Sequence, residues 1–242
     1  MQINEKLTFI DELIAYAEEL ENTVPGKGAE NSNDRDFFLY HLLHRTVRFA
    51  KAVVKLTEED FFHEVVLIAR VEIEGLAYFM AYLGKDESLA SKWRAGLRYE
   101  AYRRELERND VVAAAKLLNQ YATNLDAESL ALVTRLVKGG DEQFRDQKWH
   151  GHGNIRQAFK LLGDKSLEAL YDVVYHHFSE VVHWSPSGVV GEELDNYKEA
   201  ALNSTFHCLC EMTKYVNRIY PSKGFDYKLK DVYSRYISAM RR

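Results

Sequence analysis

The residues best placed to do chemistry lie inside a strongly apolar segment, at Arg70, Glu72 and Glu74. On a helix that turns ~100° per residue, Arg70 and Glu74 lie on nearly the same side, and Glu72 lies opposite among apolar residues. A charge inside an apolar helix is costly unless it is paired, so these side chains require partners. Either Arg70 and Glu74 form an internal ion pair that fixes helix packing, or they belong to a site between helices.

A second polar series follows in the stretch LYDVVYHHFSEVVHWSP, where Tyr171, Tyr175, Ser179 and His183 recur at every fourth residue. On a helical wheel each member of this series is rotated by ~40° from the one before, so the series moves from the apolar face of the helix to the edge of that face. We therefore expect the two tyrosines on the core side, with Ser179 and His183 emerging where the helix ends. His183 either caps the helix C-terminus, where an imidazolium is favourable, or belongs to a site.

Together the two segments predict a polar cleft between helices. Glu74 would accept a hydrogen bond from Ser179 or His183, and Tyr175 and Trp149 would wall the cleft. Such a cleft would bind a small effector, a nucleotide or a partner protein. If it is catalytic, the candidate residues are His183, Glu74 and Arg70. The alternative is a purely structural polar network in an interaction protein.

A different chemistry is suggested by Arg145 and His150, which have four residues between them in the glycine-rich stretch RDQKWHGHG. This spacing matches the Arg and His of metal-independent ribonucleases of the HEPN superfamily. A histidine can move protons at a ribose hydroxyl while an arginine stabilises the phosphorane. The alternative is a surface loop with incidental basic residues. RNA would be a partner only under the ribonuclease hypothesis.

Other constellations are less informative. Glu180 with His183, and His41 with His44, have ligand-like spacings but lack further ligands, so we expect no metal and no cofactor. Four arginines, interrupted by glutamates, predict either a solvated helix face or an RNA contact surface. They are Arg94, Arg98, Arg104 and Arg108.

The composition is that of an ordinary soluble protein. A net charge of −5 gives no general affinity for nucleic acid or acidic membranes. No apolar run approaches the ~18 residues of a membrane span, and the acidic N-terminal segment does not resemble a targeting peptide. Cys208 and Cys210 point to different helix faces, which favours two free, buried thiols in a reducing compartment. We therefore expect a cytoplasmic protein, and the sequence leaves its oligomeric state open.

Helical periodicity dominates the chain and predicts an all-α fold, a single domain over residues 1–242 with about eight or nine antiparallel helices. We expect Thr57 to be the N-cap of the third helix, and 138–154 to lack regular periodicity. A short helix should follow 154. The other expected helices cover 4–21, 34–56, 57–83, 87–121, 127–137, a segment from about 166, and the C-terminal pair within 192–241.

The motifs also resemble a family. An Arg-x-x-x-Glu helix (Arg70, Glu74), a Trp before a short helix with Arg (Trp149, Arg156) and the Tyr-Tyr-Ser-His series occur in the order found in a mainly bacterial helical family, domain of unknown function 5677. The resemblance covers about 38–186. It implies an all-helical fold and singles out Glu74, Trp149, Arg156, Ser179 and His183, with Tyr175, as binding or catalytic candidates. It implies no reaction and no cofactor, and a link to HEPN-like defence or stress modules is a looser analogy.

Overall fold

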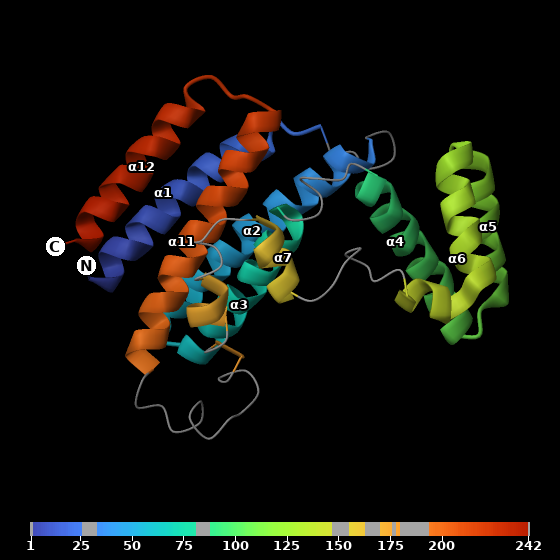
Figure 1. Ribbon diagram of the computed structural model, residues 1–242, viewed down its shortest axis with the longest axis horizontal. Coiled ribbons are helices and arrows are strands. Elements are labelled where there is room, and N and C mark those ends of the chain that lie inside the picture. The colour runs from blue at the N-terminus through green and yellow to red at the C-terminus, as the bar shows by residue number, and fades with distance from the viewer. Residues whose placement is uncertain are drawn as a thin grey trace.

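The computed structural model of the chain (Figure 1) is a bundle of helices. It describes residues 2–25, 33–80, 88–146, 155–162, 170–175, 178–179 and 194–241. Over these ranges there are nine α-helices and the π-helix at Leu170–Tyr175, and no strand. The predicted all-α fold is confirmed. None of the helices within the described ranges is both long enough and apolar enough to span a membrane.

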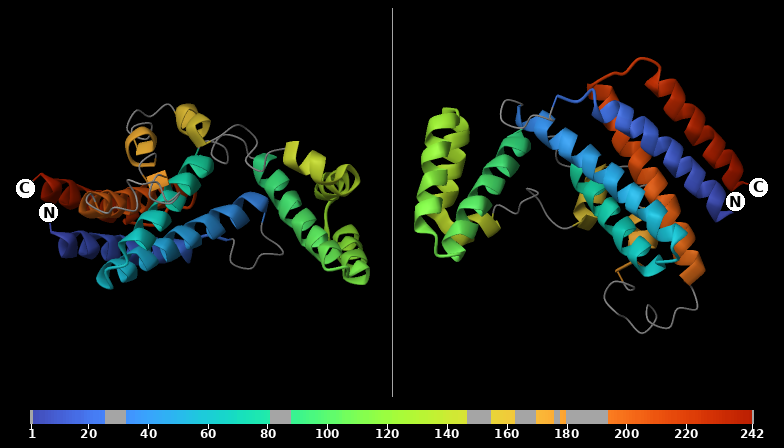
Figure 2. Two further views of the ribbon diagram at one scale, coloured as in Figure 1. Left: turned by 90° about the horizontal axis from the view of Figure 1, so that it is seen from below. Right: turned by 180° about the vertical axis from the view of Figure 1, so that it is seen from behind.

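Five helices form the main layer of the molecule. They are α1 (Ile3–Glu21), α2 (Asp34–Glu58), α3 (Phe62–Tyr78), α11 (Leu194–Ile219) and α12 (Phe225–Met240). Helix α11 packs against α1, α2, α3 and α12, so the C-terminal part of the chain completes the core that the N-terminal helices begin (Figures 1 and 2). Helix α3 is the most apolar of these elements, as expected for a helix covered on several sides.

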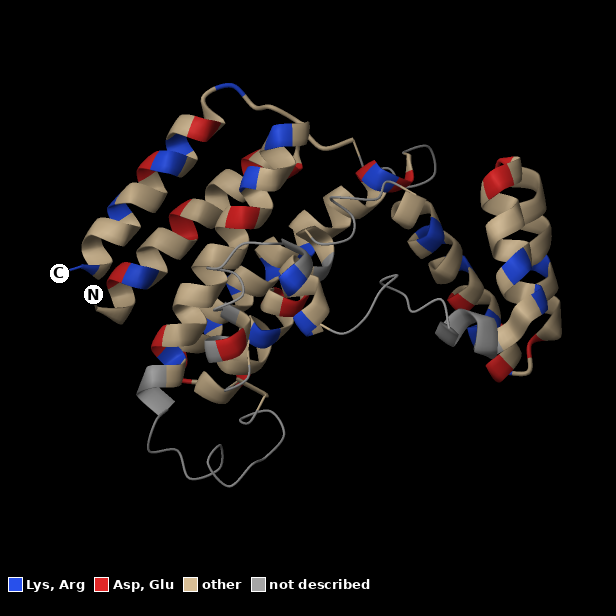
Figure 3. Cartoon of the chain, in the orientation of Figure 1, with Lys and Arg blue, Asp and Glu red and all other residues tan. Residues whose placement is uncertain are grey.

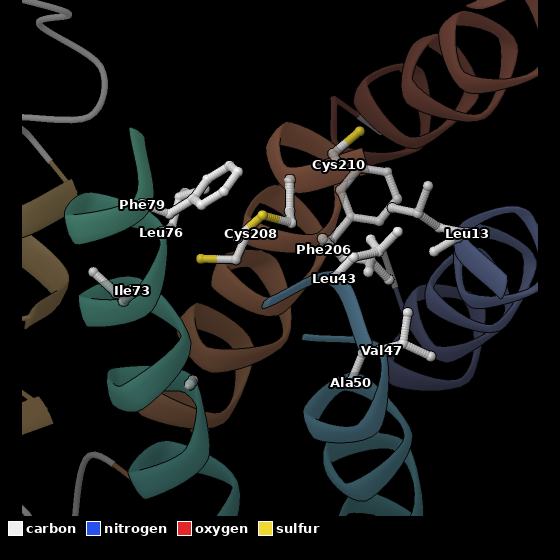
Figure 4. Packing of buried hydrophobic residues seen from close by; sticks show 14 of the residues in the cluster. Leu13, Leu43, Val47, Ala50, Ile73, Leu76, Phe79, Phe206, Cys208 and Cys210 are labelled. Atoms are coloured by element: carbon white, nitrogen blue, oxygen red, sulfur yellow. The ribbon is translucent and has the colours of Figure 1, made fainter. Parts of the chain in front are cut away.

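The centre of the main layer is closely packed with aliphatic and aromatic side chains. Figure 4 shows Phe206 of α11 directed toward Leu13 of α1, while Cys208 of the same helix points toward α3. Both cysteines are buried and free, and Cys210 points to another side of α11, as the sequence predicted. Burial raises the pKa of both thiols, so they behave as small apolar side chains.

A buried lysine joins the two ends of the chain within this layer. Lys6 of α1 is fully buried, and its ammonium donates to Glu199 and, at 3.0 Å, to the side-chain oxygen of Asn203 on α11. Tyr236 of α12 donates to the same Asn203 oxygen at 2.5 Å. Helices α1, α11 and α12 are therefore held by polar contacts as well as by apolar packing.

Three helices, α4 (Ser88–Glu107), α5 (Val111–Asn124) and α6 (Ala127–Asp146), lie to one side of the main layer (Figures 1 and 2). They have a small core of their own, built on Ala95, Tyr99, Val133 and Leu136. The contact with α2 is aromatic and ionic. The Trp93 ring meets the Phe38 ring edge-on at 5.4 Å, Arg94 lies over Phe37, and Arg94 pairs with Asp34 at 3.0 Å.

Three sequence-based boundaries are wrong for local reasons. The helix expected over 87–121 is broken at Asn109, whose φ of 59° is left-handed, and Asp110 then caps α5 by accepting from the Ala113 amide at 2.8 Å. Thr57 does not cap α3. It lies in the last turn of α2, where its hydroxyl donates to the Val53 carbonyl at 2.7 Å. Helix α6 continues beyond the predicted end, to Asp146, after a kink at Gly140 with φ of 62°.

Two short elements cover α3 on the side away from α1. Helix α7 (Ile155–Leu162) buries Ile155, Ala158 and Phe159, and the π-helix η2 (Leu170–Tyr175) also packs on α3. These elements place the polar series of the sequence next to the charged residues of α3.

The break between α4 and α5 leads to a stability prediction. Replacing Asp110 with Ala removes the N-cap of α5 and should lower the free energy of unfolding by about 1 kcal/mol in urea titrations followed by circular dichroism. The matched variant Asp110→Asn keeps a capping oxygen and should retain most of the stability. Equal losses in the two variants would show that the cap is not the cause.

Candidate functional site

Arg70, Glu74 and Tyr175 form a closed polar triad between α3 and η2. The Arg70 Nη2 donates to the Tyr175 hydroxyl at 3.1 Å and lies 3.2 Å from Glu74 Oε1. The Tyr175 hydroxyl in turn donates to the same Glu74 oxygen. The Arg70 guanidinium is also 5.1 Å from the centre of the Tyr175 ring. Each of the three side chains therefore touches the other two.

Tyr175 is a neutral phenol, and its surroundings make its ionisation still less favourable. Burial, followed by the hydrogen bond to the Glu74 carboxylate, raises the pKa of Tyr175 to about 12, and Arg70 opposes this shift. At neutral pH the phenol is therefore a hydrogen-bond donor and not a base. It links η2 to an ion pair on α3, and the Arg70 Nε, which is buried, meets no acceptor within the described part of the chain.

Aromatic stacking positions Tyr175. Its ring stacks on Tyr171 with centroids 5.1 Å apart and an interplanar angle of 18°, and Tyr171 contacts Phe159 of α7 at 5.6 Å. Ser179 continues the series, but its hydroxyl donates to the Tyr175 backbone carbonyl at 2.9 Å. Of the two donors predicted for Glu74, Ser179 or His183, Ser179 does not fill this role and His183 lies outside the described residues, while Tyr175 does donate to Glu74.

A pocket of about 190 Å³ lies beside the triad, between α2, α3 and α11. Glu74 belongs to both the triad and the pocket. The lining combines apolar side chains with four that bear charged or hydrogen-bonding groups. These residues are Leu42, Arg45, Thr46 and Phe49 from α2, Val71, Glu72, Glu74 and Gly75 from α3, and Met212 from α11.

Glu72 is the most unusual residue of the pocket. It is only 4% exposed, and the hydroxyl of Thr205 on α11 donates to its Oε2 at 2.6 Å. Its Oε1 is buried and has no hydrogen-bond partner among the residues that the structure describes. Burial raises the pKa of Glu72 to about 8, against a weaker opposing effect of Thr205, so the carboxyl is mostly protonated at neutral pH.

Gly75 leaves open space beside the backbone of α3. A Cβ atom placed there would meet nothing within 4 Å beyond its own helix. Glycine in a helix interior is less stable than alanine by about 1 kcal/mol, and here no steric conflict requires it. The pocket therefore reaches the helix backbone at a position where a larger side chain would occupy it.

With this geometry established, comparison with known proteins identifies the relationship of the chain. A family model described as a family of unknown function, DUF5677, matches residues 36–197. The chain belongs to this family. The resemblance read from the motifs is thus confirmed, and the match includes the α2 and α3 residues of the pocket. No curated protein and no solved structure matches the chain significantly.

The DUF5677 motif residues are only partly brought together. Arg70, Glu74 and Tyr175 meet in the triad, while Arg156 is exposed on the first turn of α7 and does not bond to them. Trp149, His150 and His183 lie outside the described residues, as does the side chain of Arg145. The roles of His183 and Trp149, and the ribonuclease pair Arg145 and His150, stay predictions.

The arginines Arg94, Arg104 and Arg108, of α4 and the turn that follows it, do not form an open basic patch. Arg94 is buried against Asp34, Arg104 lies 3.5 Å from Glu100, and Arg108 lies 3.0 Å from Glu105. Figure 3 shows basic and acidic segments interspersed along this helix. Within the described ranges, no group of three or more His, Cys, Asp or Glu side chains is arranged to hold a metal ion.

Glu72 predicts an unusual pH dependence of stability. An ordinary Glu has a pKa near 4.5, so between about pH 4.5 and pH 8 the folded protein holds a proton that the unfolded chain releases. The contribution of Glu72 to the free energy of unfolding should therefore fall as pH rises, by up to about 1.4 kcal/mol per pH unit. Urea titrations of the wild type and Glu72→Gln across this range isolate the effect, because the variant carries the other titrating groups unchanged. Parallel curves would contradict it.

The triad predicts a second stability effect. Tyr175→Phe removes the hydroxyl that joins Arg70 to Glu74 and should lower the free energy of unfolding by about 1–2 kcal/mol. The control Ser179→Ala removes a hydroxyl bonded only to the backbone of its own helix and should change stability by less than about 0.5 kcal/mol. Thermal denaturation of both variants makes the comparison. A larger loss in Ser179→Ala would refute the proposed importance of the triad.

Proposed function

We propose that this DUF5677 protein binds a small polar molecule in the pocket between α2, α3 and α11. The observation that carries the proposal is Glu74, a pocket residue whose side chain is 31% exposed and whose Oε2 receives no hydrogen bond or ion pair from the described residues. A carboxylate oxygen that faces a pocket in this way is available to a polar ligand, and a charge-assisted hydrogen bond to it would hold that ligand in place.

The lining supports a small ligand. The volume of about 190 Å³ corresponds to roughly six molecules of liquid water, below the range of drug-sized pockets. Leu42, Phe49, Val71 and Met212 supply apolar surface, and a few convergent polar groups supply orientation. This division is typical of small-molecule sites.

The triad gives the pocket a connection to the rest of the molecule. Glu74 lines the pocket while its Oε1 accepts from Tyr175 of η2. A ligand that contacts Glu74 would strengthen or weaken its hydrogen bond with Tyr175. It would thereby change the fraction of molecules in which η2 packs on α3. An effector-binding module in the cytoplasm is the role that we propose, and two free buried cysteines are consistent with that compartment.

Gly75 provides the test. Gly75→Ala should raise the free energy of unfolding by about 1 kcal/mol, because alanine is the better helix residue and its Cβ enters open space. Gly75→Leu should fill the pocket. Wild type and both variants would be dialysed against a pool of small polar metabolites, and the compounds retained would be measured by mass spectrometry.

A compound that the wild type retains and Gly75→Leu does not, with both proteins folded by circular dichroism, is the expected outcome. Equal retention by the two proteins would overturn the pocket as a binding site. In that case the buried polar groups of α3 would serve packing alone.

A further inference from the structure

The charges around the pocket specify the class of its occupant. We propose that the pocket binds a small zwitterion, namely a free α-amino acid with an apolar side chain, with its carboxylate at Arg45 and its ammonium at Glu74. This inference rests on the proposed function and narrows it to one kind of ligand.

Arg45 supplies the positive side of the site. It is an exposed residue of α2 that lines the pocket, and its guanidinium lies 4.9 Å from the centre of the Phe49 ring. Unlike Arg70 and Arg94, it has no carboxylate partner within the described ranges. A planar guanidinium of this kind forms two parallel hydrogen bonds with a carboxylate.

Glu74 supplies the negative side. Both of its contacts, from the Tyr175 hydroxyl and from Arg70, go to Oε1. Its Oε2 receives no hydrogen bond or ion pair from the described residues, and the side chain is 31% exposed. The carboxylate is therefore held in place by one oxygen and can accept an ammonium group with the other.

Glu72 does not compete with Glu74 for the cationic group. Its Oε2 accepts from the Thr205 hydroxyl, its Oε1 is buried from solvent, and the carboxyl is mostly protonated. A protonated carboxyl does not attract an ammonium as an anion would. Arg45 thus provides donors for an anionic group, while Glu74 provides the acceptor for a cationic one.

The remaining surface favours an apolar side chain on the ligand. Leu42, Val71 and Met212 line the pocket, and the missing side chain at Gly75 leaves room beside α3. Helix geometry explains why apolar surface and carboxyl groups lie side by side in this pocket. Val71 and Gly75 lie one turn apart at the centre of this face of α3, and Glu72 and Glu74 flank it on either side.

The direct test uses defined ligands with the wild-type chain. NMR titrations would compare L-alanine, L-valine, L-leucine and L-methionine with two analogues of leucine: 4-methylpentanoate, which lacks the amine, and 3-methylbutylamine, which lacks the carboxylate. At least one amino acid should bind, and each leucine analogue should bind at least about tenfold more weakly than leucine, because each loses one charge-assisted contact.

Two variants assign the charges. Arg45→Gln should weaken leucine binding at least about tenfold and leave 3-methylbutylamine unchanged, whereas Glu74→Gln should weaken leucine binding and leave 4-methylpentanoate unchanged. Arg48→Gln is the matched control, because Arg48 is an exposed arginine of the same helix that does not line the pocket. It should bind leucine as the wild type does.

Three results would overturn the inference. They are the absence of binding by all four amino acids, equal binding of leucine and either analogue, and unchanged leucine binding in Arg45→Gln. In each case the metabolite dialysis with Gly75→Leu tests independently whether the pocket binds any small molecule. A retained compound of another class would leave the proposed function standing while the zwitterion is excluded.

Discussion

The contact between Glu72 and Thr205 constrains the arrangement of the whole site. A carboxyl group that is 4% exposed must be neutral and must face a hydrogen-bonding partner, so α3 is fixed in rotation against α11. The helical repeat then sets the other side chains. Glu74, two residues later, faces η2, and the helix face between the two glutamates, which holds Val71 and Gly75, lines the pocket together with α2. One buried polar contact therefore positions both the pocket and the triad.

Much of this arrangement was predictable because it depends on the repeat of one helix. The pairing of Arg70 with Glu74 and the burial of Glu72 follow from residues spaced four and two apart in an apolar segment. The partner of Glu74 does not follow in this way. Tyr175 and Ser179 are both suitable donors, and only the relative placement of η2 and α3 decides between them, which local periodicity does not encode.

The pocket and the helix break were harder to foresee. Arg45 stands in the segment HRTVR, where nothing distinguishes it from Arg48, and the pocket exists only because three helices separated in sequence meet there. Asn109 lies between two segments with strong helical periodicity, and only Asp110 and two valines separate it from the alanine-rich segment that follows. Its left-handed φ, and the capping of α5 by Asp110, end one helix and start the next within three residues. Helical periodicity predicted one continuous helix, but the left-handed Asn109 and the capping Asp110 divide it into α4 and α5.

Three local features of α3 occur within four residues, and the first two of them reduce stability. Glu72 leaves a buried oxygen without a partner among the described residues, Gly75 replaces a better helix former where space is open, and Glu74 keeps one oxygen free beside a paired one. Separately, each is an ordinary imperfection of a folded chain. Their convergence on one pocket has a common physical explanation, because a ligand that fills the space beside Gly75 would cover its apolar lining and pair with the free oxygen of Glu74 at the same time.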